Sequence, residues 1–285
     1  MKFHIVSDSS CDLGRETAKE LGITMVSFYA QLGDDVYYRE EQDISTHEFY
    51  QRMADCPGVY PKTSMPTMDD YMQAMLPHVQ RGESVLCICL NSAFSGSCQA
   101  ARNTREEILE DYPDAKIHVM DSRCVTVLQG ALVEEAVSLR DAGYTLEEAV
   151  AALDTVRDSG RIFFTANDLD YLRHGGRIGA AAATTGTLLK VKPLIGYENC
   201  GLVTDGIAQG RKKCVCLGDT FLQFLLVTDD TQVGPQQILQ QGTDGGNIRT
   251  VTAEQRVALN RNMEEKISCM AFLSPRHLAM GCRSP

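Results

Sequence analysis

The chain has 285 residues, of which 44% are hydrophobic, enough for the core of one large domain or of two ordinary ones. Its formal net charge is −11 at pH 7 and no basic tract is interleaved with aromatic residues, which argues against nucleic acid and anionic membranes as main partners. No run approaches the about 18 uninterrupted apolar residues of a membrane span, and the first apolar segment is too short for a secretory signal. We therefore expect a cytoplasmic protein without stable membrane insertion.

The first part of the chain alternates apolar runs with helical patterns. The stretch FHIVSDSSCDL predicts a strand over Phe3–Val6, a polar loop and then a helix over Arg15–Leu21. Aromatic and β-branched residues on both sides of Gly33 and Asp34 predict a hairpin that turns there.

Two further segments have the order strand, loop, helix. They are SVLCICLNSAFSGSCQAAR and AKIHVMDSRCVTVLQGALVEEAVSLRDAG, with the second helix ending near Gly143. Strands that alternate with helices predict an α/β fold with a mainly parallel sheet covered on both faces. Ligands of such sheets bind beyond the carboxyl ends of the strands, and three of the predicted strand ends here carry clusters of Ser, Asp or Asn.

A second region begins near Arg161, so we expect an N-terminal domain of residues 1–160 and a C-terminal α/β domain of residues 161–285. Its pattern predicts a strand over Arg161–Thr165, a short helix over Asp168–Arg173, a glycine turn and a helix of small residues. The run KPLIGY then begins another strand.

The eleven cysteines do not form a metal-binding pattern. There is no C-x-x-C, and the six histidines are scattered, so we expect reduced thiols and no metal site. Cys87 and Cys89 alternate within one predicted strand and should therefore face the same side of the sheet.

The stretch Ser92–Ser97 places several hydroxyl groups between a predicted strand and a predicted helix. It lacks the first glycine of a G-x-S-x-G nucleophile elbow and the lysine of a phosphate-binding P-loop. The free N–H groups and the dipole of a helix N-terminus favour an anionic ligand there. Simple N-capping by Ser95 or Ser97 is the alternative that these residues leave open.

Two other segments carry candidate binding residues. Thr67 with Asp70 reads as a helix capping box, which leaves the hydroxyls of Thr63 and Ser64 available for another role. Further on, two adjacent glycines precede Arg177, and a tight turn that presents an arginine is typical of a recognition element.

Taken in order, these segments resemble the DegV family of fatty-acid-binding proteins. The family motifs T-S-x-P-S/T, S-x-x-[LF]-S-G-[ST] and L-x-Y-L-x-x-G-G-R-I match Thr63–Thr67, Ser92–Ser97 and Leu169–Ile178. The family's aspartate-serine stretch after the first strand is similar to VSDSSCDL, and its later D-S matches Asp121-Ser122. Its R-G-R-K-K resembles Arg211-Lys212-Lys213, with Gln209 where the first arginine is expected.

The resemblance implies two α/β domains with a long-chain fatty acid enclosed in a tunnel between them, and no cofactor. It implies that Thr63 and Ser95 bind the carboxylate of the fatty acid. It further implies that a separate ATP-using fatty acid kinase subunit docks at Arg177 and makes the acyl phosphate. The supporting loop residues would be Ser64, Ser92, Gly96 and Ser97. Plausible tunnel residues, for each of which packing in the core is the alternative role, are Phe28, Phe94, Phe163, Phe164, Ile178 and Leu188.

Such a carrier needs no catalytic machinery of its own. The alternative from another class is a serine hydrolase or acyltransferase that uses Ser95 as nucleophile. A structural or regulatory interaction protein is a third reading.

The motif match ends at Lys213. The closing G-P-x-I-G-x-H-x-G-P-G segment of the family, whose histidine helps to hold the carboxylate, has no counterpart in the tail, where His277 is the only histidine. A frame-shifted or otherwise altered tail and genuine divergence are both open explanations. An altered tail would remove the last strands of the second domain, leave the tunnel open and make fatty acid binding weak or absent.

Overall fold

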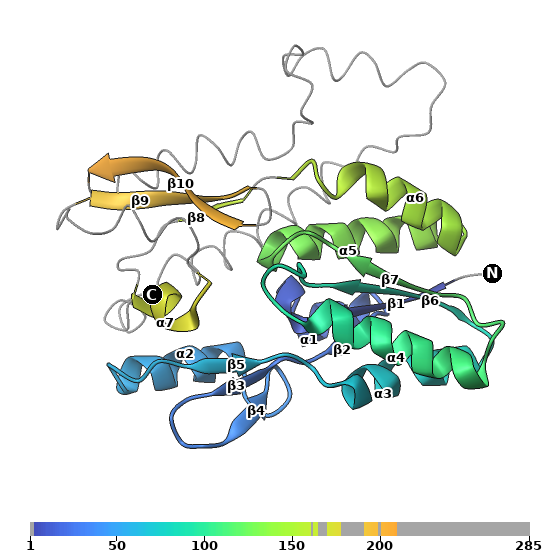
Figure 1. Ribbon diagram of the computed structural model, residues 1–285, viewed down its shortest axis with the longest axis horizontal. Coiled ribbons are helices and arrows are strands. Elements are labelled where there is room, and N and C mark those ends of the chain that lie inside the picture. The colour runs from blue at the N-terminus through green and yellow to red at the C-terminus, as the bar shows by residue number, and fades with distance from the viewer. Residues whose placement is uncertain (1–2, 161, 165–169, 178–190, 199–200, 210–285) are drawn as a thin grey trace, which may run out of the picture.

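The computed structural model describes residues 3–160, 162–164, 170–177, 191–198 and 201–209 (Figure 1). Its centre is a four-stranded sheet, called here the parallel sheet, in which all neighbouring strands are parallel. In spatial order it contains β2 (Thr24–Val26), β1 (Phe3–Asp8), β6 (Ser84–Cys89) and β7 (Ile117–Asp121). The prediction of a mainly parallel sheet is confirmed.

Helices cover both faces of the parallel sheet, as the alternation of elements predicts (Figure 1). Leu86 and Ile88 of β6 pack with one group of helices, and Val85 and Cys87 pack with the other. The first group comprises α1 (Arg15–Glu20), α5 (Thr126–Asp141) and α6 (Leu146–Val156), and the second comprises α3 (Met68–Gln80) and α4 (Ser97–Asp111).

Strand β1 is longer than the sequence predicts. Ser7 and Asp8 continue the ladder of β1, followed by the short 3-10 helix η1 (Ser9–Cys11). These polar residues remain in a buried strand because their side chains are hydrogen-bonded: the Ser7 hydroxyl donates to the Ile88 carbonyl at 2.9 Å.

Cys87 and Cys89 lie on the same side of the parallel sheet, as predicted, with their sulfur atoms 3.6 Å apart. Both are fully buried, as is usual for a central strand that has helices on each face. The cysteines in the described part of the chain are free thiols: Cys11, Cys56, Cys87, Cys89, Cys98 and Cys124.

A small antiparallel sheet precedes α3. It has the order β4-β3-β5, formed by β3 (Tyr29–Gln31), β4 (Tyr37–Arg39) and β5 (Lys62–Ser64), with α2 (Thr46–Asp55) between β4 and β5. The predicted hairpin around Gly33 is therefore present, but the part of its first arm over Thr24–Val26 joins the parallel sheet as β2 instead.

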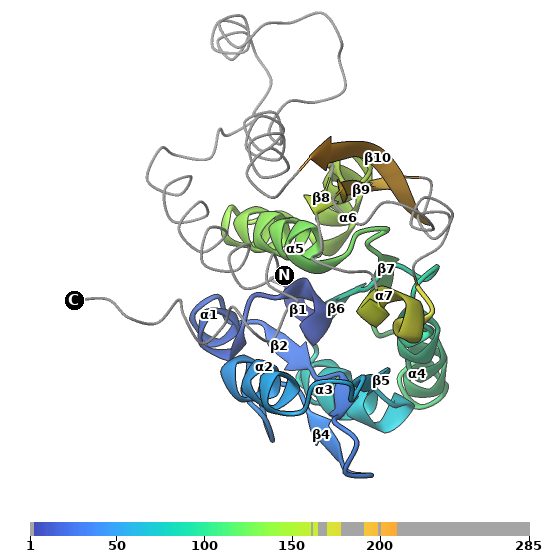
Figure 2. The same ribbon diagram turned by 90° about the vertical axis from the view of Figure 1, so that its left-hand side faces the viewer.

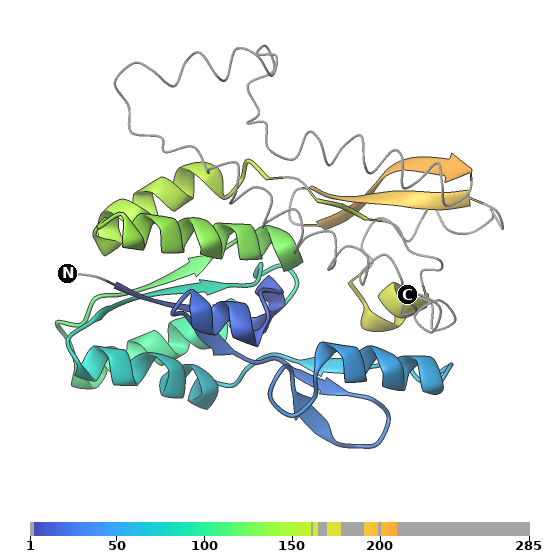
Figure 3. The same cartoon turned by 180° about the vertical axis from the view of Figure 1, so that it is seen from behind.

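The second region contributes another antiparallel sheet, with the order β10-β9-β8. It lies beyond the carboxyl ends of the parallel strands, as the front and back views show (Figures 1 and 3). Its elements are β8 (Phe163–Phe164), α7 (Asp170–Gly175), β9 (Val191–Glu198) and β10 (Gly201–Gln209). The predicted helix of small residues and the tail lie outside the described residues, and the boundary near Gly160 stays a prediction.

The helices within the described ranges are all too short or too polar to cross a membrane.

Candidate anion-binding site beyond the parallel strands

The loop of residues 91–96 connects β6 to α4 and carries Ser95. Ser95 is half-buried, and its hydroxyl oxygen accepts a hydrogen bond from the backbone N–H of Ser97 at 3.2 Å. A serine hydroxyl has one proton and two acceptor lone pairs, so this contact leaves the Ser95 proton for an acceptor such as a carboxylate. The N-cap position of α4 is occupied by Gly96, so neither Ser95 nor Ser97 is the N-cap residue, although Ser95 accepts from the first N–H of the helix.

The segment that carries Thr63 contacts the loop through Met65, two residues further along the chain. Thr63 is exposed on β5, opposite Ala30 of β3. The Met65 side chain packs so closely on Gly96 that a Cβ at that glycine would lie 2.7 Å from the Met65 sulfur. The two hydroxyl-bearing segments predicted from the sequence are therefore held side by side by the contact between Met65 and Gly96.

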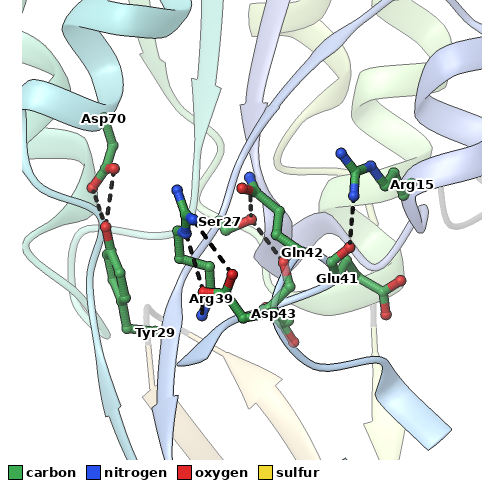
Figure 4. Close-up of polar contacts among 9 residues, drawn as sticks. Arg15, Ser27, Tyr29, Arg39, Glu41, Gln42, Asp43 and Asp70 are labelled. Carbon is green, nitrogen blue, oxygen red and sulfur yellow. Dashed lines mark hydrogen bonds and ion pairs between the residues drawn. The ribbon is translucent and has the colours of Figure 1, made fainter. Parts of the chain in front are cut away.

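The predicted capping box at the start of α3 is present. The Asp70 N–H donates to the Thr67 hydroxyl at 3.2 Å, and the Thr67 N–H donates to the Asp70 carboxylate at 2.8 Å. Asp70 also accepts from the Tyr29 hydroxyl at 3.0 Å (Figure 4). Burial and this carboxylate raise the pKa of Tyr29. Asp70 thus connects the small antiparallel sheet to α3. Among the described residues, the Ser64 hydroxyl donates to the Met65 carbonyl.

A buried polar cluster lies behind the loop. The Asp8 carboxylate, fully buried at the end of β1, accepts from the Ser97 hydroxyl, the Leu90 N–H and the Gln129 amide at 2.8, 2.9 and 2.8 Å. The Tyr71 hydroxyl lies 2.7 Å from the Ser97 hydroxyl. Ser97, expected in the supporting loop, therefore points its side chain into the protein.

The hydroxyl of Ser92, another predicted loop residue, is also engaged. It donates to the Asp121 carboxylate at 2.5 Å, and the N–H groups of Ser92 and Arg123 donate to the other oxygen of the same carboxylate at 3.3 and 3.0 Å. Asp121 ends β7, so this contact joins the ends of neighbouring parallel strands. Ser92 thus fixes the loop through exposed contacts with Asp121, whereas Ser97 fixes it through the buried carboxylate of Asp8.

Phe94 extends from the loop to the second region. Its ring centroid lies 5.6 Å from that of Tyr197 on β9, and the Arg177 guanidinium donates to its carbonyl at 3.5 Å. Arg177 itself is exposed. Phe94 packs with a small apolar cluster that also contains Phe164, Leu172, Tyr197, Ile195 and Leu202. The side chain of Phe163, and all of Ile178 and Leu188, lie outside what the structure describes.

A second contact joins the two regions near Thr63. The ring of Tyr60 stacks on His174 of α7, with centroids 3.5 Å apart and planes 6° apart, and meets Tyr171 edge-on. Figures 1 and 2 both show α7 near β5. The loop with Ser95 contacts the second region through Phe94. Tyr60, which precedes the strand with Thr63, contacts it through α7.

One group of potential metal ligands occurs among the described residues, at the opposite end of the parallel sheet. It comprises His4, His78 and Glu83, whose ligand atoms lie within 4.8 Å of one another. The two imidazole rings stack with centroids 3.4 Å apart and planes 15° apart, so their in-plane lone pairs do not converge on one point. The Arg81 guanidinium lies 2.7 Å from the ring nitrogen of His78 and pairs with Glu83. We therefore assign no metal to this group.

Comparison with known proteins identifies the family. The model of the DegV family, described as uncharacterised proteins, matches residues 2–254 of this chain. The chain belongs to the DegV family. The resemblance seen in the sequence motifs is confirmed, and the match of the family model extends beyond Lys213, where those motifs end.

Relatives and solved structures support the assignment to the DegV family. A DegV domain-containing protein of Clostridium perfringens is 32% identical over 214 residues, which are 74% of this chain and 73% of the relative. A stearic acid-binding protein from Eubacterium ventriosum is 39% identical, with a TM-score of 0.72 over 78% of this chain and 77% of its own. The fatty acid kinase (Fak) B3 protein of Streptococcus pneumoniae, solved with linoleic acid, is 26% identical, with a TM-score of 0.66 and 79% of each chain covered. The mixed α/β fold is thus shared with two-domain DegV proteins.

Sequence reasoning missed three members of the buried cluster. The sequence places Asp8 in a polar stretch after the first strand but does not indicate which residues it contacts. Tyr71 and Gln129 are single polar residues on helices. Nothing in the local pattern marks such helix positions as buried. The strand-end position of Asp8 was the one usable signal.

Proposed function

We propose that the protein binds a long-chain fatty acid and holds its carboxylate between Thr63 and Ser95. The observation that carries this proposal is the contact of Met65 with Gly96, which places the two hydroxyl segments side by side at the ends of the parallel strands. Ser95 retains a hydroxyl proton to donate, because its oxygen already accepts from Ser97. Donated hydrogen bonds reduce the cost of taking a carboxylate out of water.

The acyl chain would extend between the two regions. Burial of each CH₂ group contributes about 0.8 kcal/mol, so an apolar enclosure supplies most of the affinity for a long chain. The apolar cluster around Phe94 lies where the loop meets the second region and would line part of that enclosure. The similarity to the stearic acid-binding protein and to the B3 protein solved with linoleic acid supports this ligand class.

The first experiment measures the affinity for oleic acid by calorimetry after removal of any lipid. Thr63→Ala and Ser95→Ala should each weaken binding about 10-fold, the effect of one lost hydrogen bond to a charged group. Thr155→Ala and Ser138→Ala remove chemically matched hydroxyls that donate within their own helices and should leave the affinity unchanged. Unchanged affinity in both site variants would contradict the proposed carboxylate site.

We further propose that the bound carboxylate is presented to a separate ATP-dependent kinase subunit, which forms the acyl phosphate, and that this partner docks at Arg177. The similarity to a fatty acid kinase B protein and the exposure of Arg177 beside the Phe94 carbonyl support this step. In a reconstituted assay with a fatty acid kinase catalytic subunit, Arg177→Glu should abolish acyl phosphate formation. Arg173→Glu, the same charge change on α7, should not. Fatty acid affinity measured in parallel shows whether the loss lies in docking or in binding.

The alternative function is a serine hydrolase or acyltransferase that uses Ser95. A nucleophilic serine needs a base that accepts its proton, whereas the recorded hydrogen bond of Ser95 is one that it accepts from a backbone N–H. A fluorophosphonate probe distinguishes the two functions. The carrier should remain unlabelled at Ser95, and stoichiometric labelling there would favour the enzyme.

A further inference from the structure

The Asp8 carboxylate is a buried acidic group to which the proposed function gives no role. It has no exposed surface, and none of its recorded hydrogen-bond partners is a cation. One oxygen accepts from the Ser10 hydroxyl at 2.5 Å and from the Gln129 amide at 2.8 Å. The other accepts from the Leu90 N–H at 2.9 Å and from the Ser97 hydroxyl at 2.8 Å. A buried carboxylate held by neutral donors is costly, and such groups are retained where the geometry that they fix is needed.

The partners of the second oxygen lie at the two ends of one loop. Leu90 directly follows β6 and Ser97 is the first residue of α4, so a single carboxylate oxygen holds both ends of the loop that carries Ser95. Ser97 has a second task, since its backbone N–H donates to the Ser95 hydroxyl. Asp8 is therefore connected, through Ser97, to the Ser95 hydroxyl.

The same carboxylate is connected to the segment with Thr63. The Tyr71 hydroxyl on α3 lies 2.7 Å from the Ser97 hydroxyl and 3.3 Å from the Asp8 carboxylate. Tyr71 is fully buried and lies in the first turns of α3, whose capping residue Thr67 follows directly on the Thr63 segment. Both hydroxyl segments are thus fixed to one point at the end of β1.

We propose that Asp8 is the positioning residue of the carboxylate-binding site. Asp8 does not touch the ligand but sets the geometry with which Ser95 and the Thr63 segment meet an anionic head group. The inference rests on the proposed fatty acid function. It requires that the loss of Asp8 weaken recognition of the carboxylate while leaving the binding of the hydrocarbon chain intact.

The test compares oleic acid with oleyl alcohol, which has the same chain and no charge. The wild-type protein should prefer the acid. Asp8→Ala should lower the ratio of acid to alcohol affinity about 10-fold and leave the alcohol affinity within about twofold, because hydrogen bonds to the head group alone are disturbed. Ser97→Ala should act in the same direction, and it keeps the test available if Asp8→Ala does not fold. Asp8→Asn keeps one oxygen for Leu90 and Ser97 and should restore most of the ratio.

Thr104→Ala is the control for loss of stability. Its buried hydroxyl lies on α4 and donates to the Ala100 and Met68 carbonyls, away from the loop, so the variant should lower the melting temperature without changing the ratio. A wild-type ratio in both Asp8→Ala and Ser97→Ala would overturn the positioning role alone. A wild-type protein that binds neither ligand would overturn the proposed function, and this inference with it.

Discussion

Burial raises the pKa of the Glu40 carboxyl from 4.5 to about 7, although its hydrogen bond from the Ser9 hydroxyl acts in the opposite direction. The folded protein therefore keeps this proton between about pH 4.5 and 7, where the unfolded chain loses it. A protein that binds more protons in the folded than in the unfolded state becomes less stable as the pH rises. The free energy of unfolding should therefore fall between about pH 4.5 and 7 because of Glu40, and the loss should stay constant above pH 7.

Glu40→Gln should therefore gain stability relative to the wild type as the pH rises from 5 to 8, because glutamine resembles the protonated acid and can still accept from Ser9. The full difference is roughly 3.5 kcal/mol at most, about 1.4 kcal/mol for each unit of pKa change. Urea unfolding at several pH values measures it, and Glu20→Gln controls for the removal of one surface charge. A difference from wild type that does not vary with pH would show that Glu40 is not protonated in the folded protein.

Ser97 shows what can and cannot be predicted at the scale of a residue. The sequence places it at a helix start next to Ser95 and leaves open which of the two caps the helix. Its true partner, Asp8, is 89 residues away in the chain. Contacts of this kind depend on how β1, β6 and α4 pack together, and a local pattern does not contain that information.

At the scale of elements, the capping boxes of two helices can be compared directly. Thr67 with Asp70 at the start of α3 and Thr145 with Glu148 at the start of α6 have the same hydrogen bonds at nearly the same distances. Only the box of α3 carries a recorded additional bond, from Tyr29 to Asp70 (Figure 4).

Glu148→Ala should destabilise the protein slightly, because the Thr145 N–H loses its acceptor in the capping box. Asp70→Ala should cost about 1 kcal/mol more, since the Tyr29 hydroxyl also loses its acceptor. Urea unfolding measures both. In a Tyr29→Phe background the two alanine variants should become equal, and a persisting difference would mean that the Tyr29 contact is not what separates them.

The same elements explain why much of the fold is predictable. The T-x-x-D pattern, the apolar run of β6 and the alternation of strands with helices are local signals, and each corresponds to a described element. The split of the first hairpin arm is different: Thr24–Val26 pairs with β1 instead of turning back at Gly33, because an edge of the parallel sheet is available to it. The choice of Thr24–Val26 between the hairpin and the edge of the parallel sheet arises only in the folded protein, where that edge exists.

At the scale of the whole molecule, the recorded ring contacts that join the two regions are those of Phe94 with Tyr197 and of Tyr60 with α7. Phe94→Ala should loosen the second region while leaving the parallel sheet intact. Hydrogen exchange should then become faster over residues 191–209 and stay unchanged in β1 and β6. Phe49→Ala, the loss of a ring on α2, is the control. Equal acceleration in β1 and β6 would show that Phe94 stabilises the whole chain rather than the contact between its regions.

The central claim is that Thr63 and Ser95 together hold the carboxylate of a fatty acid, and native mass spectrometry of the freshly purified protein tests it most directly. A denatured run on the same sample verifies the full chain, including the tail after Lys213. The wild-type protein should have a native mass higher by one fatty acid, and the Thr63→Ala, Ser95→Ala double variant should lose that mass. A full-length wild-type protein that stays empty after incubation with a panel of fatty acids, or a double variant that retains the lipid as fully as the wild type, would contradict the claim.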